Sequence, residues 1–377
     1  MDFDWSQEQH DFRKAVIRFA MAELTDGEDS VEWFRAAWKK CAEFGIQGLP
    51  LSPDFGGGGA SHLTVVAALE ALGYACLDNG FIFSLNAHMW ACQHPIACFG
   101  NQEQKARYLP GLADGSLIGA HAMSEPGAGS DALALRTTAT MTGNRYRLQG
   151  SKTFVSNAPL ADVFIVFART PGTAGFSGLS SFILEKDMPG LRVGPPLKKM
   201  GLHSSRMAEV FFDDCEVPAA NLLGRPGFGM PVFTAAMELE RSMILASTIG
   251  TMERTLERTL AYARERRQFE QPIGKFQAVS HPLVNMKLRL ETARLLLYRL
   301  AWLIDHGRPT ALDSALVKLH LSEAYVATSL EALQIYGGYG YMTEFGLEGE
   351  VRDALAARLY SGTSEIQRNL AARHLGL

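Results

Sequence analysis

A loop of small and polar residues between positions 122 and 131 offers residue types suited to chemistry. It reads Ala-Met-Ser-Glu-Pro-Gly-Ala-Gly-Ser-Asp, so hydroxyls and backbone amides are dense and side chains are mostly short. A backbone rich in glycine can approach a planar ring or a phosphate closely because no Cβ holds the ligand away. The alternative interpretation is an ordinary tight turn.

Part of this loop, Gly127 to Ala132, also fits a loose dinucleotide fingerprint, G-x-G-x-x-A. That fingerprint needs a following helix and then an acidic residue about 20 residues further on, after a second strand. The sequence instead predicts a hairpin over 137–148, because Gly143-Asn144 separates two strand-like runs. We therefore do not expect a nicotinamide dinucleotide domain here.

Glu240, in the run Glu238-Leu239-Glu240-Arg241, is a second candidate, because a positioned carboxylate can take a proton from carbon. From the local sequence alone, a solvated carboxylate paired with a neighbouring arginine is the more ordinary interpretation. Metal chemistry is not indicated, since the five cysteines are scattered and no H-x-x-x-H occurs with a nearby carboxylate. We expect the cysteines to be buried, reduced thiols.

The elements that must position these residues change character twice along the chain. Helical periodicity dominates up to about residue 115, short β-rich runs follow to about 222, and long amphipathic stretches resume from 227. This order argues against a repeated βαβ fold and predicts an α+β protein. The predicted parts are an N-terminal helical domain (1–115), a middle antiparallel β-domain (116–223) and a C-terminal helical bundle (224–377).

Composition narrows the possible partners. Lys+Arg is 36 and Asp+Glu is 40, a net charge of −4, and no basic block suggests nucleic-acid binding. No stretch is long and apolar enough for a membrane span. The N-terminus, Met-Asp-Phe-Asp-Trp, is acidic where a signal peptide would be basic, so we expect a cytoplasmic protein.

Five segments, in the same order and spacing, resemble the signature motifs of the acyl-CoA dehydrogenase family. They are 122–131, 154–158, 266–269 with Gln277, 334–340 and 360–367. The resemblance implies a helical domain, a β-domain and a C-terminal four-helix bundle. It also implies an FAD cofactor and α,β-dehydrogenation of an acyl thioester.

The resemblance also assigns cofactor contacts to residues of this chain. Met123, Ser124 and Ser156 would line the isoalloxazine ring, with Phe154 as an aromatic plate where the family usually has Trp. Ser130 would meet the flavin phosphate or the pantetheine arm. The neighbouring subunit's flavin would be contacted by Arg266, Phe269, Gln277, Gln334 and Gly338. Thr363 and Glu365 would lie by the adenosine part of the FAD. Glu270 stands where the family usually has glycine.

Ser361 occupies the position where the common family pattern has its catalytic glutamate. A neutral hydroxyl does not readily remove the α-proton of a thioester at neutral pH, whereas a carboxylate does. A minority of family members carry the base on a bundle helix in an L-E-R context, which Glu240 matches. We therefore expect Glu240 to be the base, with Ser361 beside the substrate and Arg241 near its pantetheine end. A structural ion pair of Arg241 with Glu238 or Glu257 is the alternative.

One branch fits better, the flavin dehydrogenases of prolyl-carrier proteins, on segments 157–162, 211–218, 277–281, 287–297 and 361–364. This implies oxidation of a carrier-bound prolyl group toward dehydroproline or pyrrole-2-carboxyl in natural-product (antibiotic) biosynthesis. The alternatives are a short- or branched-chain acyl-CoA, another carrier-bound acyl group, or a non-catalytic flavin-binding protein. The implied partners are an acyl or peptidyl carrier protein or a CoA thioester, further copies of the chain in a homotetramer or homodimer, and O2 or an electron-transfer flavoprotein as electron acceptor.

Overall fold

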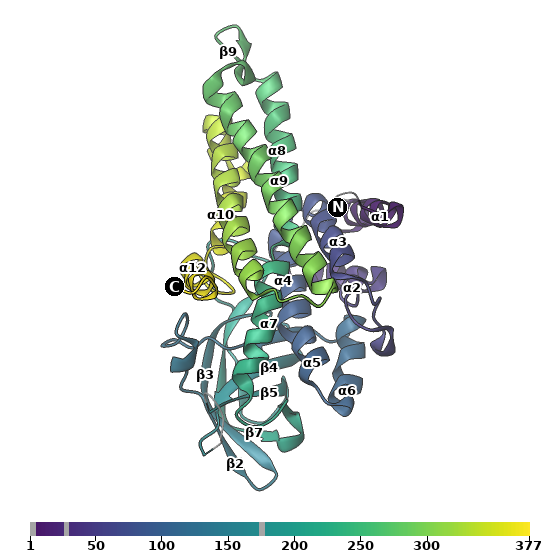
Figure 1. Cartoon of the computed structure of the whole chain (residues 1–377), viewed down its shortest axis with the longest axis vertical. Helices are drawn as coiled ribbons and strands as arrows, with labels where there is room; N and C mark the ends of the chain where they lie inside the picture. The colour runs from purple at the N-terminus through teal and green to yellow at the C-terminus, as the bar shows by residue number, and fades with distance from the viewer. Residues whose placement is uncertain (1–4, 26–29, 173–177) are drawn as a thin grey trace.

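The structure is a computed structural model that describes residues 5–25, 30–172 and 178–377. The long helices α8, α9 and α10 form one end of the molecule and a β sheet forms the other (Figure 1). The helices of the N-terminal third lie beside them (Figure 1). The acidic N-terminal residues 1–4, used above to argue for a cytoplasmic protein, lie outside the described residues.

Polar N-cap residues begin most helices of the N-terminal third. At α1, α2, α3, α4 and α6 a serine, aspartate or asparagine side chain accepts a hydrogen bond from an amide of the first turn. A π-helical segment, Ala87–Gln93, joins α4 to α5. The helices are α1 (Gln7–Glu23), α2 (Val31–Phe44), α3 (His62–Ala75), α4 (Asn79–Asn86), α5 (His94–Phe99) and α6 (Gln102–Ala113).

The middle of the chain forms an eight-stranded sheet in the order β6-β7-β3-β2-β4-β5-β8, with β1 paired to β4. Its strands are β1 (Gly119–Ala122), β2 (Thr138–Thr142), β3 (Arg145–Ser156), β4 (Val163–Arg169), β5 (Leu179–Glu185), β6 (Leu191–Val193), β7 (Met207–Pro218) and β8 (Leu222–Leu223). The Gly143-Asn144 hairpin between β2 and β3 is confirmed. The sheet departs from the predicted antiparallel pattern at β4, because β1 and β2 both run parallel to that strand.

Long helices return after β8, as the periodicity predicts. They are α7 (Gly229–Met243), α8 (Ala246–Glu265), α9 (Gln277–Asp305), α10 (Ala311–Tyr336), α11 (Leu347–Ala356) and α12 (Ser364–His374). A two-stranded turn, β9 (Arg267–Gln268) with β10 (Gln271–Pro272), joins α8 to α9 at the tip of the bundle (Figure 1). The predicted three-part fold is confirmed, while the boundaries at 115 and 223 stay a prediction.

Two glycines let α3 and α8 meet at backbone distance. A Cβ on Gly73 would lie 1.9 Å from the carbonyl oxygen of Ser247, and one on Gly250 would lie 1.9 Å from that of Glu70. No side chain fits at either position, so the N-terminal helices and the bundle share a close joint.

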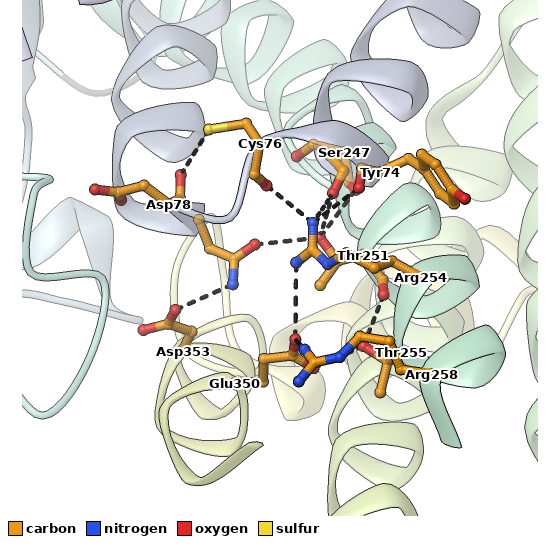
Figure 2. Close-up of polar contacts among 12 residues, drawn as sticks. Tyr74, Cys76, Asp78, Ser247, Thr251, Arg254, Thr255, Arg258, Glu350 and Asp353 are labelled. Atoms are coloured by element: carbon orange, nitrogen blue, oxygen red, sulfur yellow. Dashed lines mark hydrogen bonds and ion pairs between the residues drawn. The ribbon is translucent and has the colours of Figure 1, made fainter. Parts of the chain in front are cut away.

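Arg254 of α8 secures this joint by donating hydrogen bonds to three carbonyl oxygens, those of Gly73, Tyr74 and Cys76, at 2.7–3.1 Å (Figure 2). These carbonyls belong to the last turn of α3 and to its C-cap residue, where helix carbonyls lack partners within the helix. Glu350 of α11 lies 3.7 Å from the same guanidinium and accepts from Thr255 at 2.6 Å. This network therefore ties α3, α8 and α11 together.

The described structure also bears on the state of the cysteines, on metal binding and on membrane spanning. Four cysteines are buried as predicted, Cys98 is exposed, and none forms a disulfide within the described ranges. Among residues 5–25, 30–172 and 178–377, no group of three or more His, Cys, Asp or Glu side chains is arranged to hold a metal ion. No helix in the described part of the chain is long and apolar enough to cross a membrane.

Candidate active site

Glu240 and Ser361, 121 residues apart in the chain, meet where α7 contacts the turn between α11 and α12. The hydroxyl of Ser361 donates a hydrogen bond of 2.6 Å to Oε1 of Glu240. Glu240 is only 8 % exposed, which rules out the solvated helix-face carboxylate that the local sequence favours. The two positions at which the resemblance allows the base therefore converge on one place in this fold.

Burial raises the pKa of Glu240 to about 7, although the hydrogen bond from Ser361 and the charge of Arg241 act in the opposite direction. Within the described structure, Oε2 of Glu240 has no hydrogen-bond partner. An unpartnered carboxylate oxygen in a dry site is costly unless a ligand uses it. A carboxylate with a pKa near neutrality is suited to take up a proton and release it again.

Ser361 lies in a strained turn between α11 and α12. Its φ of 52° is in the left-handed region that residues other than glycine rarely adopt, and Gly362 follows with a φ of 89°. The fully buried side-chain amide of Gln367 donates to the carbonyl oxygens of Ser361 and Gly362 at 3.1 and 3.0 Å. Gln367 belongs to one of the five recognised segments, but its residue type alone does not predict this role.

A small cavity is lined in part by the residue that precedes Ser361. It has a volume of about 20 Å3 and is lined partly by Phe83 of α4, Ile244 at the end of α7, and Tyr360. Tyr360 directly precedes Ser361, and its ring lies 4.8 Å from that of Phe83. The amide of Ile244 donates to the carbonyl oxygen of Glu240. The residues that line the cavity do not include Glu240 or Ser361, and its volume is about that of one ordered water.

A buried ion pair fixes the loop that carries Met123 and Ser124. Lys152 of β3 is fully buried and donates to Oε1 of Glu125 at 2.8 Å and to the carbonyl oxygen of Met123 at 3.0 Å. Glu125 also accepts from the amides of Arg136 and Thr137. This pair is not among the predicted site residues. Lys152 has the same strand parity as the buried Tyr146 and Leu148, which is the signal that would have found it.

Phe154 and Ser156 reach the same region from the end of β3. The pairing of β3 with β7 shifts register between Lys152 and Val155, and Phe154 adopts a φ of 56° there. This bulge leaves the Phe154 ring 65 % exposed. Asn157 anchors the next turn by donating to the carbonyl oxygens of Ser84 and Gly119, which fixes the half-buried Ser156. Met123 and Ser124 belong to the same cluster, because the amide of Thr153 donates to the carbonyl oxygen of Ser124.

A second cluster lies at the bundle tip, away from the sheet (Figure 1). A cavity of about 560 Å3 is lined there by Arg266, Gly338 and Tyr339 among others. The guanidinium of Arg266 lies 5.4 Å from the centre of the Tyr339 ring, and Phe269 is 87 % exposed. Gln277 begins α9 and Gln334 lies near the end of α10, and both are exposed. Glu270 keeps a left-handed φ of 65°, the conformation that glycine adopts readily.

The remaining predicted residues lie elsewhere. Ser130 is exposed, as is Glu365, which pairs with Arg368 at 3.8 Å. Thr363 caps α12 by accepting from the amide of Ile366. Arg241 donates to the carbonyl oxygen of Met237 within its own helix.

The alternative ion pair of Arg241 is not formed among the described residues. Glu238 accepts from Thr310 and Glu257 accepts from Tyr74, so both carboxylates are engaged elsewhere. Arg241 is therefore left available to a ligand.

Both clusters fit a flavin dinucleotide. A Cβ built on Gly127, Gly129, Gly337 or Gly338 would meet open space, so a ring or phosphate can approach the backbone at both places. The exposed ring of Phe154 in one cluster and of Phe269 in the other offers an apolar face. Because the tip cluster lies far from the cluster around Met123 and Phe154 in one chain, this donor set suits a cofactor shared between two copies (Figure 1).

Comparison with known proteins covers nearly the whole chain. Three family profiles match in succession: "Acyl-CoA dehydrogenase, N-terminal domain" over residues 6–116, "middle domain" over 120–215, and "C-terminal domain" over 227–376. Together they span all three parts of the fold.

Individual relatives align over their full length. An "L-prolyl-[peptidyl-carrier protein] dehydrogenase" of Pseudomonas fluorescens is 43% identical over 380 residues, covering 100% of both chains. Among solved structures, the prolyl acyl carrier protein oxidase AnaB is 47% identical with a TM-score of 0.96, covering 99% of this chain and 100% of that one. A structure described as PigA with FAD and proline is 40% identical with a TM-score of 0.96, covering 100% of both chains.

Proposed function

The chain belongs to the acyl-CoA dehydrogenase family and is an FAD-dependent dehydrogenase, and from this premise we propose that it oxidises a prolyl group held as a thioester on a carrier protein. The observation that carries the reaction is the buried Glu240, whose Oε2 is unpartnered beside the serine that replaces the usual base. The relatives named for prolyl carriers, at 43% and 47% identity, support the substrate.

Glu240 acts as the base in the proposed reaction. Oε2 accepts the α-proton of the thioester, while Oε1 stays hydrogen-bonded to Ser361. Burial keeps water away from the carboxylate, which strengthens its interaction with the substrate. FAD, when bound, supplies the acceptor for the hydride that leaves the β-carbon. Met123, Ser124 and Ser156, with Phe154 as an exposed apolar face, would hold its ring.

Two further polar residues would meet the substrate by resemblance. Arg241 would lie at its pantetheine end, and Ser130 would be a further polar contact.

Assembly into at least a dimer, and a homotetramer by resemblance, is part of the proposal. The tip cluster belongs to the β9–β10 turn and the adjoining ends of α8, α9 and α10, away from the sheet of its own chain (Figure 1). Its residues Arg266, Phe269, Gln277, Gln334 and Gly338 would serve a neighbour's FAD. The outer face of α9 carries an apolar stripe that a second copy could cover. Its members are Val284, Leu288, Leu295 and Trp302, which are 65, 64, 52 and 46 % exposed.

The substrate carrier and the electron acceptor remain choices within the proposal. Carrier protein and free CoA present the same pantetheine thioester, so a short- or branched-chain acyl-CoA is the second candidate, and another carrier-bound acyl group is the third. O2 and an electron-transfer flavoprotein are both compatible acceptors. A non-catalytic flavin-binding role is disfavoured, because a buried carboxylate without a ligand would be costly. The cytoplasm stays the predicted location.

The test is intact-mass analysis of a prolyl-loaded carrier protein after incubation with the purified flavoprotein in air. Loss of two hydrogens indicates a dehydroproline, and loss of four indicates a second round toward pyrrole-2-carboxyl. Glu240→Gln serves as the matched control and should leave the mass unchanged. An unchanged mass with the wild-type protein, together with bleaching of its flavin by a short acyl-CoA, would replace the prolyl substrate with the second candidate.

A further inference from the structure

We propose that Ser361 is a positioning residue, which holds Glu240 so that one defined oxygen of the carboxylate faces the acyl group. This inference rests on the proposed function, in which Glu240 is the base. Ser361 then does more than fill the place of a displaced glutamate, because its hydroxyl sets both the orientation and the proton affinity of the base.

The hydrogen bond between the two residues restricts a torsion that is otherwise soft. The last side-chain torsion of glutamate has a broad, two-fold profile, so an unheld carboxylate presents either oxygen in a range of directions. Ser361 Oγ donates to Oε1 at 2.6 Å, a short bond typical of a hydroxyl with a charged acceptor. Oε2 lacks any partner in the described residues, and it is the oxygen left for the substrate.

The backbone around Ser361 is built to direct this hydroxyl. A φ of 52° is unusual for serine. The buried side-chain amide of Gln367 donates to the carbonyl oxygens of Ser361 and Gly362 and so fixes the turn. Strain of this kind persists where surrounding contacts over-determine the conformation, and it is found often at functional sites. Gln367 therefore acts on Glu240 through Ser361.

The charged and titratable groups around Glu240 are few. Arg241 lies on the same helix and favours the charged carboxylate, and Tyr360 faces it from the turn. Lys318 of α10 lies beyond them, with its ammonium over the Tyr360 ring and donating to the carbonyl oxygen of Ala357. Glu238 interacts with Arg241. The Ser361 hydroxyl is the largest influence that lowers the pKa of Glu240 against burial.

Ser361→Gly is the decisive variant, because glycine keeps the left-handed turn while removing the hydroxyl. The readout is infrared difference spectroscopy of protein labelled with 13C-glutamate, with the Glu240 band identified by its loss in Glu240→Gln. We expect the midpoint of Glu240 ionisation to rise by about one pH unit, since a hydrogen bond to the charged form favours that form. Flavin reduction by substrate should then fall about tenfold below the new midpoint and recover at higher pH.

The same turn offers a matched control. Ser364 Oγ donates to Oε1 of Glu323 at 2.7 Å, so Ser364→Ala also removes a serine-to-glutamate hydrogen bond three residues away. This variant should leave the Glu240 midpoint unchanged. Gln367→Met removes the amide donor and should shift the midpoint in the same direction as Ser361→Gly. Combined with Ser361→Gly it should add nothing, because both changes act through one hydroxyl.

Two results would overturn the inference: a Glu240 midpoint in Ser361→Gly equal to that of the wild type, or an equal shift in Ser364→Ala. Failure of the proposed function gives a different pattern. A wild-type flavin that no acyl thioester reduces would contradict that function, whereas the infrared titration would still decide the role of Ser361.

Discussion

Replacing the buried base with its neutral isostere should stabilise the protein while abolishing its chemistry. Glu240 has a pKa of about 7 in the fold against 4.5 for an ordinary glutamate, because burial disfavours the charged form. The folded state therefore holds its proton more tightly than the unfolded state does. The contribution of Glu240 to the free energy of unfolding is greatest below pH 4.5, falls as the pH rises to about 7, and is constant above that value.

The size of the effect follows from the two pKa values. At about 1.36 kcal/mol per pH unit, the difference corresponds to about 3 kcal/mol of lost stability at pH 8. Glutamine does not titrate and escapes this loss, so Glu240→Gln should gain most of that amount relative to the wild type between pH 5 and pH 8.

The assay is denaturant unfolding of both proteins at pH 5 and pH 8, followed by circular dichroism. The difference in the free energy of unfolding between the two proteins is measured at pH 5 and again at pH 8. The change in this difference cancels the contributions of every other titrating group. Flavin reduction by the thioester should meanwhile fall by about 100-fold to 10,000-fold, the usual contribution of a general base. A stability difference that is the same at both pH values would refute the assignment of a neutral-range pKa to Glu240.

Three further outcomes follow from the site. In the wild type, the rate of flavin reduction in stopped-flow mixing should rise about tenfold per pH unit up to about pH 7 and then level off, since only the ionised Glu240 accepts a proton. Lys152→Met leaves Glu125 buried without its cation and should cost about 3–5 kcal/mol in denaturant unfolding, while a simultaneous Glu125→Gln should recover part of that loss. Arg266→Ala should lower the ratio of flavin to protein absorbance after gel filtration without reducing helix content, because this side chain is exposed at the bundle tip and lies over the Tyr339 ring.

Periodicity and turn chemistry predict most of the fold. The apolar stripe at positions 245–260 places α8, and Gly143-Asn144 places the β2–β3 hairpin, because both are local signals of known period. The parallel pairing of β1 with β4 is not local. β1 has only four residues and ends 41 residues before β4 begins, and no alternation pattern in the sequence encodes their pairing.

The residues of the candidate site are likewise predictable only in part from the sequence. Glu240 and Ser361 are found by residue type within motifs, yet their hydrogen bond is a tertiary contact across 121 residues and is visible only in the fold. Gln367 was missed for the same reason, since its two acceptors are backbone carbonyls of a turn whose strained geometry the sequence does not announce. Lys152 is different, because strand parity directs it inward and a lysine there requires a partner.

The glycine joint between α3 and α8 limits how this protein can acquire a new substrate. Gly73 and Gly250 each face a backbone carbonyl with no room for a side chain, and Arg254 holds the end of α3 against α8 (Figure 2). The spacing between α3 and α8 is therefore inherited unchanged by any descendant that keeps these residues. New acyl specificities would arise by exchanging single residues nearer the substrate, within a frame whose dimensions do not drift.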